Sequence, residues 1–84
     1  MTRDLSNEAI SLAHQLRLGR SLEAVQNLPD LLGLVVNRST SWKTERQAAL
    51  PALINLMLKY QEREDWLGLA DNLEYELIAL LESR

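Results

Sequence analysis

The sequence predicts an all-α protein, in which four helices form one antiparallel bundle of two helical hairpins, as a single domain over residues 1–84. The composition favours helices, because leucine occurs nineteen times, against three valines, three isoleucines and no phenylalanine. Leucine loses little rotamer freedom in a helix, whereas branching at Cβ costs more of it. Apolar residues recur with a period near 3.6 residues, and glycines and capping residues separate the periodic segments. A chain of this length has room for one core.

The first helix is expected near residues 5–18. Asp4 or Ser6 can accept a hydrogen bond from one of the N–H groups that the first turn leaves unpaired. Gly19 ends this helix, since glycine tolerates the left-handed backbone conformation that closes a helix. The connection at residues 19–20 is so short that the first two helices are expected to be antiparallel neighbours.

The second helix is expected near residues 21–37, with Ser21 as its cap. Pro29 lies inside it and lacks an N–H group, so the helix is expected to be kinked there or to restart with Asn27 as a new cap. The polar segment NRSTS, residues 37–41, is predicted to be a loop.

The third helix is expected near residues 42–61. Thr44 and Gln47 have the spacing of a capping box, in which each side chain binds the other residue's backbone N–H group. Pro51 lies within the periodic pattern, and a second kink is predicted there. The polar segment QERED, residues 61–65, is predicted to be a turn.

The fourth helix is expected near residues 65–82, with Asp65 as its cap. Its apolar side chains fall within an arc of about 120° on a helical wheel. They are Trp66, Leu69, Ala70, Leu73, Leu77, Leu80 and Leu81. This is the pattern of a helix that packs against the core along one side only.

The two central helices carry more apolar surface than one shared seam needs. Apolar residues cover roughly half the circumference of the second helix and about 200° of the third. Two interpretations are open. Either these helices fill the centre of an irregular bundle, or part of their surface contacts another chain.

Charge is distributed unevenly along the chain, whose net charge is −3. Residues 1–46 hold six basic and five acidic side chains, whereas residues 47–84 hold three basic and seven acidic ones. The acidic second half repels phosphate backbones. The basic candidates of the first half, which do not share one exposed helix face, are Arg17, Arg20, Arg38, Lys43 and Arg46. A recognition helix requires such a face, so nucleic acid is not the expected partner.

Catalysis and cofactor binding are not expected, and no small-molecule substrate is implied. The chain has no cysteine, which excludes disulfides, thiolate metal sites and a cysteine nucleophile. The one histidine, His14, lacks the partners of a catalytic triad, and no glycine-rich segment suits a phosphate. We therefore expect a protein that is not an enzyme and has no catalytic, cofactor or metal site.

The acids of the fourth helix are interpreted as solvated charges. They are Asp71, Glu74, Glu76 and Glu82. On the wheel these carboxylates diverge, whereas metal sites in helical bundles need several ligands that converge in the core. Glu76 borders the apolar stripe and is expected to be partly covered by a neighbour carrying Lys59 or Arg63.

Apolar residues that a single core seam does not need are the candidate partner contacts. Three groups lie on the first, third and fourth helices. They are Ile10, His14 and Leu18; Leu56, Met57 and Tyr60; and Leu67, Tyr75 and Ile78. Apolar groups of this size, with tyrosine among them, are typical of contact surfaces, although His14 alone is equally explained as an exposed histidine.

Two segments resemble known helical proteins. AHQLRLGRSLEAVQNL, residues 13–28, resembles tetratricopeptide-like hairpins, with Gly19 at the turn and Ala24 as the small residue between helices. WLGLADNLEYELIALL, residues 66–81, is similar to short uncharacterised bacterial proteins with an LADxLEYEL-like tail, some of them encoded near flagellar or motility genes. The first resemblance implies helical hairpins that bind other proteins, and the second implies no site residue.

The sequence thus predicts a small cytoplasmic protein-interaction module, an adaptor, chaperone-like or regulatory protein. Its apolar helix faces would bind a partner protein or a second copy of itself, as in a homodimer. The alternative is a structural homo-oligomeric subunit; a nucleic-acid-associated regulator or an unrecognised enzyme is less favoured. No signal peptide, anchor or membrane span is expected, because no apolar run approaches the ~18 residues that a spanning helix needs.

Overall fold

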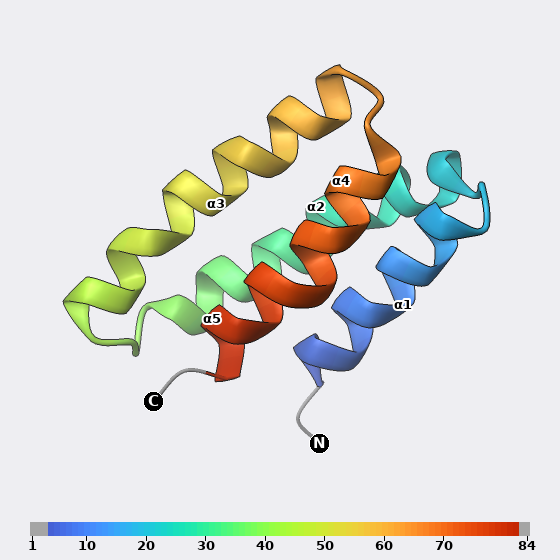
Figure 1. Cartoon of the computed structure of the whole chain (residues 1–84). Helices are drawn as coiled ribbons and strands as arrows, with labels where there is room; N and C mark the ends of the chain where they lie inside the picture. Colours follow the sequence, from blue (N-terminus) through green and yellow to red (C-terminus); the bar gives the residue numbers. More distant parts are fainter. Residues whose placement is uncertain (1–3, 83–84) are drawn as a thin grey trace.

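The computed structural model describes residues 4–82, and in this range the protein is all-helical, with no strand (Figure 1). The helices are α1 (Leu5–Arg17), α2 (Ser21–Ser39), α3 (Thr44–Glu62), α4 (Trp66–Asp71), η1 (Asn72–Leu77) and α5 (Ile78–Glu82). The last three follow one another without a break, and we call residues 66–82 together the C-terminal helix. The all-α prediction with four helical stretches is confirmed.

Local signals determine both ends of α1. The Asp4 side chain accepts a hydrogen bond from the Asn7 N–H group at 3.3 Å, so Asp4 is the cap. Gly19 has a φ of 82°, and the Arg20 N–H group donates back to the Gln15 carbonyl at 2.8 Å. This left-handed closure is the role that glycine plays after a helix, and it confirms the predicted end of the first helix.

The beginning of α2 differs from the prediction. Ser21 is the first helical residue rather than the cap, and no side-chain bond caps this helix. The helix continues without interruption past Pro29, which is exposed, so there is no restart at Asn27. Packing of the opposite side, where Leu28 and Leu31 are buried, explains why one missing N–H group does not end the helix. A kink at Pro29 stays a prediction.

The end of α2 lies two residues beyond the predicted boundary, so the loop prediction for residues 37–41 is wrong for its first three positions. Three successive hydroxyls donate to the carbonyl three residues earlier: Ser39 to Val36 at 2.6 Å, Thr40 to Asn37 at 2.9 Å and Ser41 to Arg38 at 3.0 Å. These bonds add to the backbone bonds that Thr40 and Ser41 donate to the Asn37 and Arg38 carbonyls, and they support helical backbone in a segment of loop-like composition.

The predicted capping box at the start of α3 does not form. Lys43 occupies the cap position, Thr44 is already helical, and no side chain caps the helix. The Gln47 N–H group instead donates to the Lys43 carbonyl at 2.9 Å. Like α2, α3 continues past its proline, Pro51, and the second kink also stays a prediction.

The turn after α3 is compact and well bonded. Glu64 has a φ of 54°, and the Asp65 N–H group donates to the Tyr60 carbonyl at 2.9 Å. The Asp65 carboxylate then accepts from the Gly68 N–H group at 3.0 Å. The predicted cap at Asp65 is confirmed, and the turn within residues 61–65 is confined to its last three residues.

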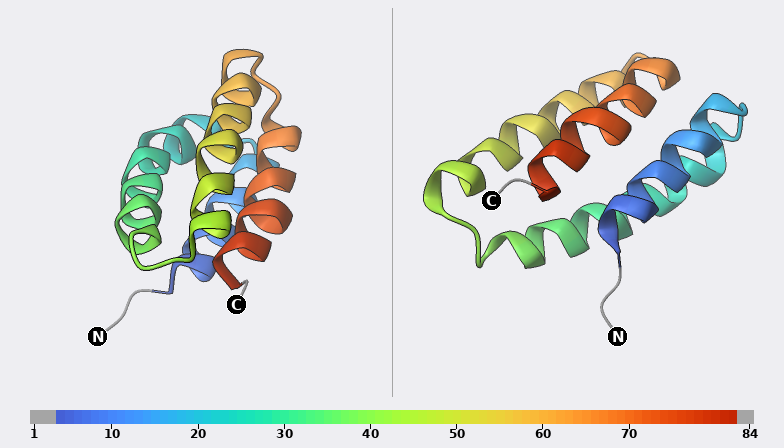
Figure 2. Two further views of the ribbon diagram at one scale, coloured as in Figure 1. Left: turned by 90° about the vertical axis from the view of Figure 1, so that its left-hand side faces the viewer. Right: turned by 60° about the horizontal axis from the view of Figure 1, so that its bottom comes forward.

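The core lies where α1 meets α2 and the C-terminal helix. The C-terminal helix runs between α1 and α3, and α1 lies against α2 (Figures 1 and 2). Small residues bring the helices close, since Ala9 and Ala13 of α1 and Ala70 of α4 are fully buried. None of the helices in residues 4–82 has the length and apolar character needed to cross a bilayer.

Candidate protein-binding groove

Helix α3 leaves much of its apolar surface uncovered. Only Leu50 and Met57 of this helix are fully buried, whereas Leu56 and Leu58 are 40% and 45% exposed. The C-terminal helix covers one side of α3, and α2 touches it much less. The core therefore does not bury all of the apolar surface that the sequence pattern predicts for this helix.

Two hollows lie along the seam between α3 and the C-terminal helix. The larger, about 480 Å³, is lined mainly by Ala49, Ala52, Leu53, Leu56, Ala79 and Leu80. The second, about 320 Å³, is lined mainly by Leu53, Leu56, Tyr60, Asn72, Tyr75 and Glu76. Both hollows are lined by Leu53, Leu56 and Glu76, so they adjoin each other along the seam. We call the two together the α3 groove.

The groove combines apolar walls with a few polar groups. Tyr75 is 63% exposed at one side, and the carboxylates of Asp71 and Glu76 belong to the lining. Asn72 is only 4% exposed, and its Oδ1 atom has no hydrogen-bond partner among the described residues. A mostly apolar depression with a small number of placed polar groups is the usual form of a binding site.

A change of helix type positions the polar residues of the groove. Residues 72–77 form a π-helical turn, in which hydrogen bonds span five residues instead of four. Such turns occur often at functional sites, because the wider spacing shifts side chains relative to the α-helical pattern. Asn72 begins this turn and is buried in it. The apolar stripe predicted for an unbroken α-helix does not include Asn72.

Gly68 allows the ring of Tyr60 to lie against the C-terminal helix. A Cβ atom at Gly68 would lie 2.7 Å from Cε1 of Tyr60 and 2.7 Å from Oδ2 of Asp65, the residue that caps α4. Neither approach is tolerable without movement. The glycine is thus needed for close packing of a groove-lining tyrosine.

Gly68→Ala is expected to lower the free energy of unfolding by about 1 kcal/mol, because a steric cost of about 1–3 kcal/mol outweighs the better helix propensity of alanine. Gly33→Ala is the matched control, since a Cβ atom there meets nothing within 4 Å. It should raise stability by about 0.5–1 kcal/mol. Urea denaturation followed by circular dichroism measures both, and a stabilised Gly68→Ala protein would refute the close packing.

The structure brings together some of the predicted contact residues. Leu56 and Tyr60 of α3 and Tyr75 of the C-terminal helix, assigned to separate surfaces by the sequence, line the same hollow. Met57 is instead fully buried, so it contributes to packing and not to an accessible surface. Its place on the wide apolar arc did not distinguish it from its exposed neighbour Leu56.

The other candidates lie outside the groove lining. Leu67 is exposed, while Ile78 is half-buried against the core. Ile10, His14 and Leu18 are all exposed along α1, as the sequence predicted. They line neither of the two hollows of the groove.

Two of the acids thought to be solvated are paired. Arg17 of α1 places Nη2 2.6 Å from an Asp71 oxygen and Nη1 2.5 Å from a Glu74 oxygen. Loss of hydration lowers the pKa of Arg17, but the hydrogen bonds to Asp71 and Glu74 and the negative charges of these two residues together raise it by more, so the net shift is upward. The interpretation of Asp71 and Glu74 as merely solvated is corrected: they join α1 to the C-terminal helix.

Arg46, a candidate basic surface residue, is partly buried and joins two helix ends. Its guanidinium group donates to the Leu80 carbonyl at 2.8 Å and to the Leu81 carbonyl at 2.6 Å. It also lies 4.0 Å from the centre of the Trp42 ring. A cation at the C-terminal end of a helix satisfies unpaired carbonyls and interacts favourably with the helix dipole.

Arg46→Met, which keeps most of the aliphatic stem, is expected to lower the free energy of unfolding by about 1–2 kcal/mol through loss of two charged hydrogen bonds. Lys43→Met is the control, because Lys43 is exposed and its side chain caps no helix. The control should stay within about 0.5 kcal/mol of the unaltered protein. Equal losses in urea denaturation would contradict the assigned role of Arg46.

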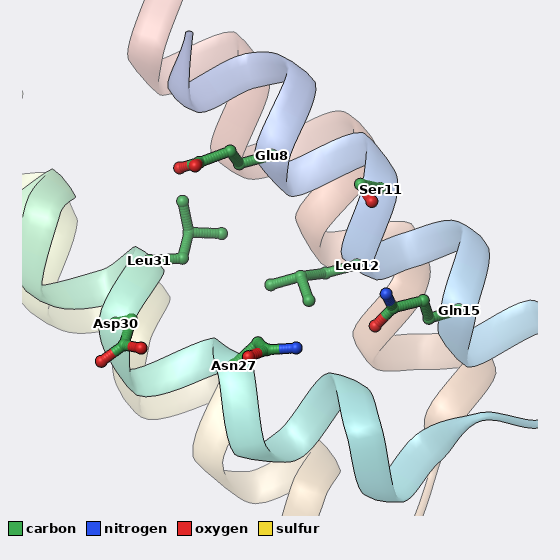
Figure 3. A pocket seen from close by; sticks show the side chains of 7 residues that line it. All are labelled: Glu8, Ser11, Leu12, Gln15, Asn27, Asp30 and Leu31. Atoms are coloured by element: carbon green, nitrogen blue, oxygen red, sulfur yellow. The ribbon is translucent and has the colours of Figure 1, made fainter. Parts of the chain in front are cut away.

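A third hollow, about 200 Å³, lies between α1 and α2 (Figure 3). Its polar lining residues, all labelled in Figure 3, are Glu8, Ser11 and Gln15 of α1 and Asn27 and Asp30 of α2. It is smaller and more polar than the α3 groove and lacks exposed aromatic anchors. Within residues 4–82, no three histidine, aspartate or glutamate side chains gather closely enough to hold a metal ion.

Comparisons with known proteins do not bear on the function of the α3 groove. The resemblance of residues 13–28 to tetratricopeptide-like hairpins stays a prediction. No model of a known family, no curated protein and no solved structure matches this chain.

Proposed function

We propose that this protein is a small non-catalytic interaction module whose α3 groove holds an apolar helix of a partner protein. The observation that carries the proposal is the pair of adjoining hollows between α3 and the C-terminal helix, with Leu56 and Tyr75 exposed in their lining. Grooves of this kind accept amphipathic helices, whose anchors lie at intervals of three or four residues. Adaptor, chaperone-like and regulatory roles all use such binding.

The exposed anchors support specific but moderate affinity. Full burial of an aliphatic or aromatic side chain contributes about 1.5–3 kcal/mol, and Leu56 and Tyr75 are each partly exposed before binding. Association itself costs about 4–15 kcal/mol in lost freedom of movement. A few such anchors from each partner therefore support dissociation constants of about micromolar magnitude.

The proposal includes the finer architecture and location expected from the sequence. The four helical stretches act as two antiparallel hairpins, kinked at Pro29 and Pro51, and the module works in the cytoplasm. Support for the hairpins comes from the short turns at Gly19 and at Glu64, each closed by a left-handed residue.

A second candidate function is that of a structural homo-oligomeric subunit. It is favoured by exposed leucines at the turn between α1 and α2, where Leu18 and Leu22 lie four residues apart in the chain. Exposed apolar groups of this kind can pair with a second copy. Sedimentation over a range of concentrations distinguishes the two functions, because only the subunit gains mass as it is concentrated.

Affinity capture from the native cell tests the interaction module. The unaltered protein is expected to retain one partner in stoichiometric amount, and Leu56→Glu is expected to lose it. Leu58→Glu is the matched control, since Leu58 lies on the same helix with similar exposure but lines neither hollow of the groove. A partner retained by the Leu56 variant and lost by the Leu58 variant would contradict the proposal.

A further inference from the structure

The charged side chains that line the α3 groove are all acidic. Its lining includes the carboxylates of Asp71 and Glu76, and none of its lining residues is lysine, arginine or histidine. Arg17 already pairs with Asp71. Glu76 is exposed, belongs to both hollows, and has no ion pair within residues 4–82. The expected bridge to Lys59 or Arg63 does not form there, and the Glu76 carboxylate remains available to a cation.

The same groove contains a second polar group without a partner. Asn72 is more than nine-tenths buried and lines the hollow to which Glu76 also belongs, with its Oδ1 atom unpaired among the described residues. A buried unpaired oxygen costs about 1–3 kcal/mol, which a hydrogen-bond donor would recover. Both polar groups, Glu76 and Asn72 Oδ1, are acceptors. What enters the groove should therefore bring donors and positive charge.

We propose that the occupant of the α3 groove is a basic amphipathic helix of another protein. Its apolar side chains would fill the space beside Leu53 and Leu56, and an arginine or lysine would bind Glu76. Arginine suits the site best, because its planar guanidinium group can donate two parallel hydrogen bonds to the Glu76 carboxylate. This inference rests on the proposed function and adds the chemistry of the partner.

A second copy of this chain is a poorer occupant. Placing two α3 grooves face to face would bring their Glu76 carboxylates together without a cation between them. Docking α1 of one copy, with Ile10 and His14, into the groove of another would be a head-to-tail contact, which generates open chains unless it closes into a ring. A separate basic helix requires neither arrangement.

Synthetic peptides test the inference on the full chain. The probe is a helix of about 18 residues, long enough to form in a groove, with leucines on one face and arginines on the other. Its counterpart carries glutamates in place of the arginines. The protein is expected to bind the basic peptide at least about tenfold more tightly at 0.15 M salt, measured by isothermal calorimetry.

Reversal of one charge separates recognition at Glu76 from general attraction. Glu76→Lys is expected to weaken binding of the basic peptide about tenfold and to strengthen binding of the acidic one. Glu23→Lys changes the net charge equally but lies on α2, outside the groove, and should leave both affinities within about twofold. Equal effects of the two substitutions, or no binding of the basic peptide, would overturn the inference.

Leu56→Glu distinguishes failure of this inference from failure of the proposed function. If that variant loses the peptides while Glu76→Lys changes nothing, the groove binds helices without charge selection, and only the present inference fails. If the peptides bind equally well to Leu56→Glu, the groove is not the docking site and the proposed function fails as well. A dimer that forms on concentration and disappears in Leu56→Glu would identify a second copy as the occupant and overturn the inference.

Discussion

Leu56→Glu is expected to weaken binding of the captured partner by at least about 100-fold, because the substitution places a charge at the centre of an apolar interface. Leu56 belongs to both hollows of the groove and is 40% exposed, so the glutamate remains hydrated in the unbound protein. The free energy of unfolding should therefore change by no more than about 0.5 kcal/mol. Calorimetric titration of the purified partner measures the affinity, and urea denaturation measures the stability.

Leu58→Glu provides the comparison that makes this result specific. Leu58 is 45% exposed on the same helix, and it lines neither hollow of the groove. Leu58→Glu introduces the same charge as Leu56→Glu, two residues further along the same helix. Binding should change by less than about threefold, because charges outside an interface alter affinity only slightly. Comparable losses in both variants would show that the partner does not depend on the groove.

Leu73→Ala is expected to lower the free energy of unfolding by about 2–5 kcal/mol. Leu73 is 1% exposed and lies in the π-helical turn, packed among the buried residues of the core. A domain of 84 residues has a total stability of only about 4–13 kcal/mol, so one such cavity removes a large part of it. The thermal midpoint should fall by about 8 °C or more when followed by circular dichroism.

The control for this loss is Leu67→Ala on the same C-terminal helix. Leu67 is 64% exposed, so its removal opens no cavity and should change stability by less than about 0.5 kcal/mol. The pair compares one chemical change at a buried and at an exposed position. If Leu67→Ala is as costly as Leu73→Ala, the assigned orientation of the C-terminal helix is incorrect.

Short-range signals in the sequence were sufficient to predict several features of the fold. Gly19 and Asp65 are such cases, because the left-handed closure and the side-chain cap each involve residues no more than five apart. The buried stripe of the C-terminal helix was also identified correctly at Leu69, Leu73 and Leu77. These features depend on local geometry and on periodicity, both of which are visible in a single sequence.

Competing local bonds explain the errors at helix ends. Ser21 and Thr44 have the composition of caps, but each becomes the first helical residue and the preceding residue takes the cap position. The hydroxyls that extend α2 to Ser39 bond to carbonyls instead of ending the helix. Serine and threonine can do either, so their presence alone did not determine the boundary.

Prediction of the α3 groove would have required knowledge of which helices pack together, and no local sequence pattern contains it. Leu56 and Tyr75 were each candidates, but nothing in the sequence indicated that they line one hollow. The ion pair of Arg17 with Asp71 and the bonds from Arg46 to the end of α5 join residues 54 and 34 or more positions apart. Such contacts depend on which helices become neighbours, and therefore the paired acids were first interpreted as solvated.

Site-specific photo-crosslinking in the native cell tests most directly whether the α3 groove holds a helix of another protein. A benzophenone side chain replaces Tyr75 in the groove, or Leu22, which is 73% exposed on α2 and outside it. We expect a single adduct of defined mass from position 75 and none from position 22, with the crosslink mapping to a helix of the partner. Adducts that form from position 22 but not from position 75 would contradict the assignment of the groove as the binding site.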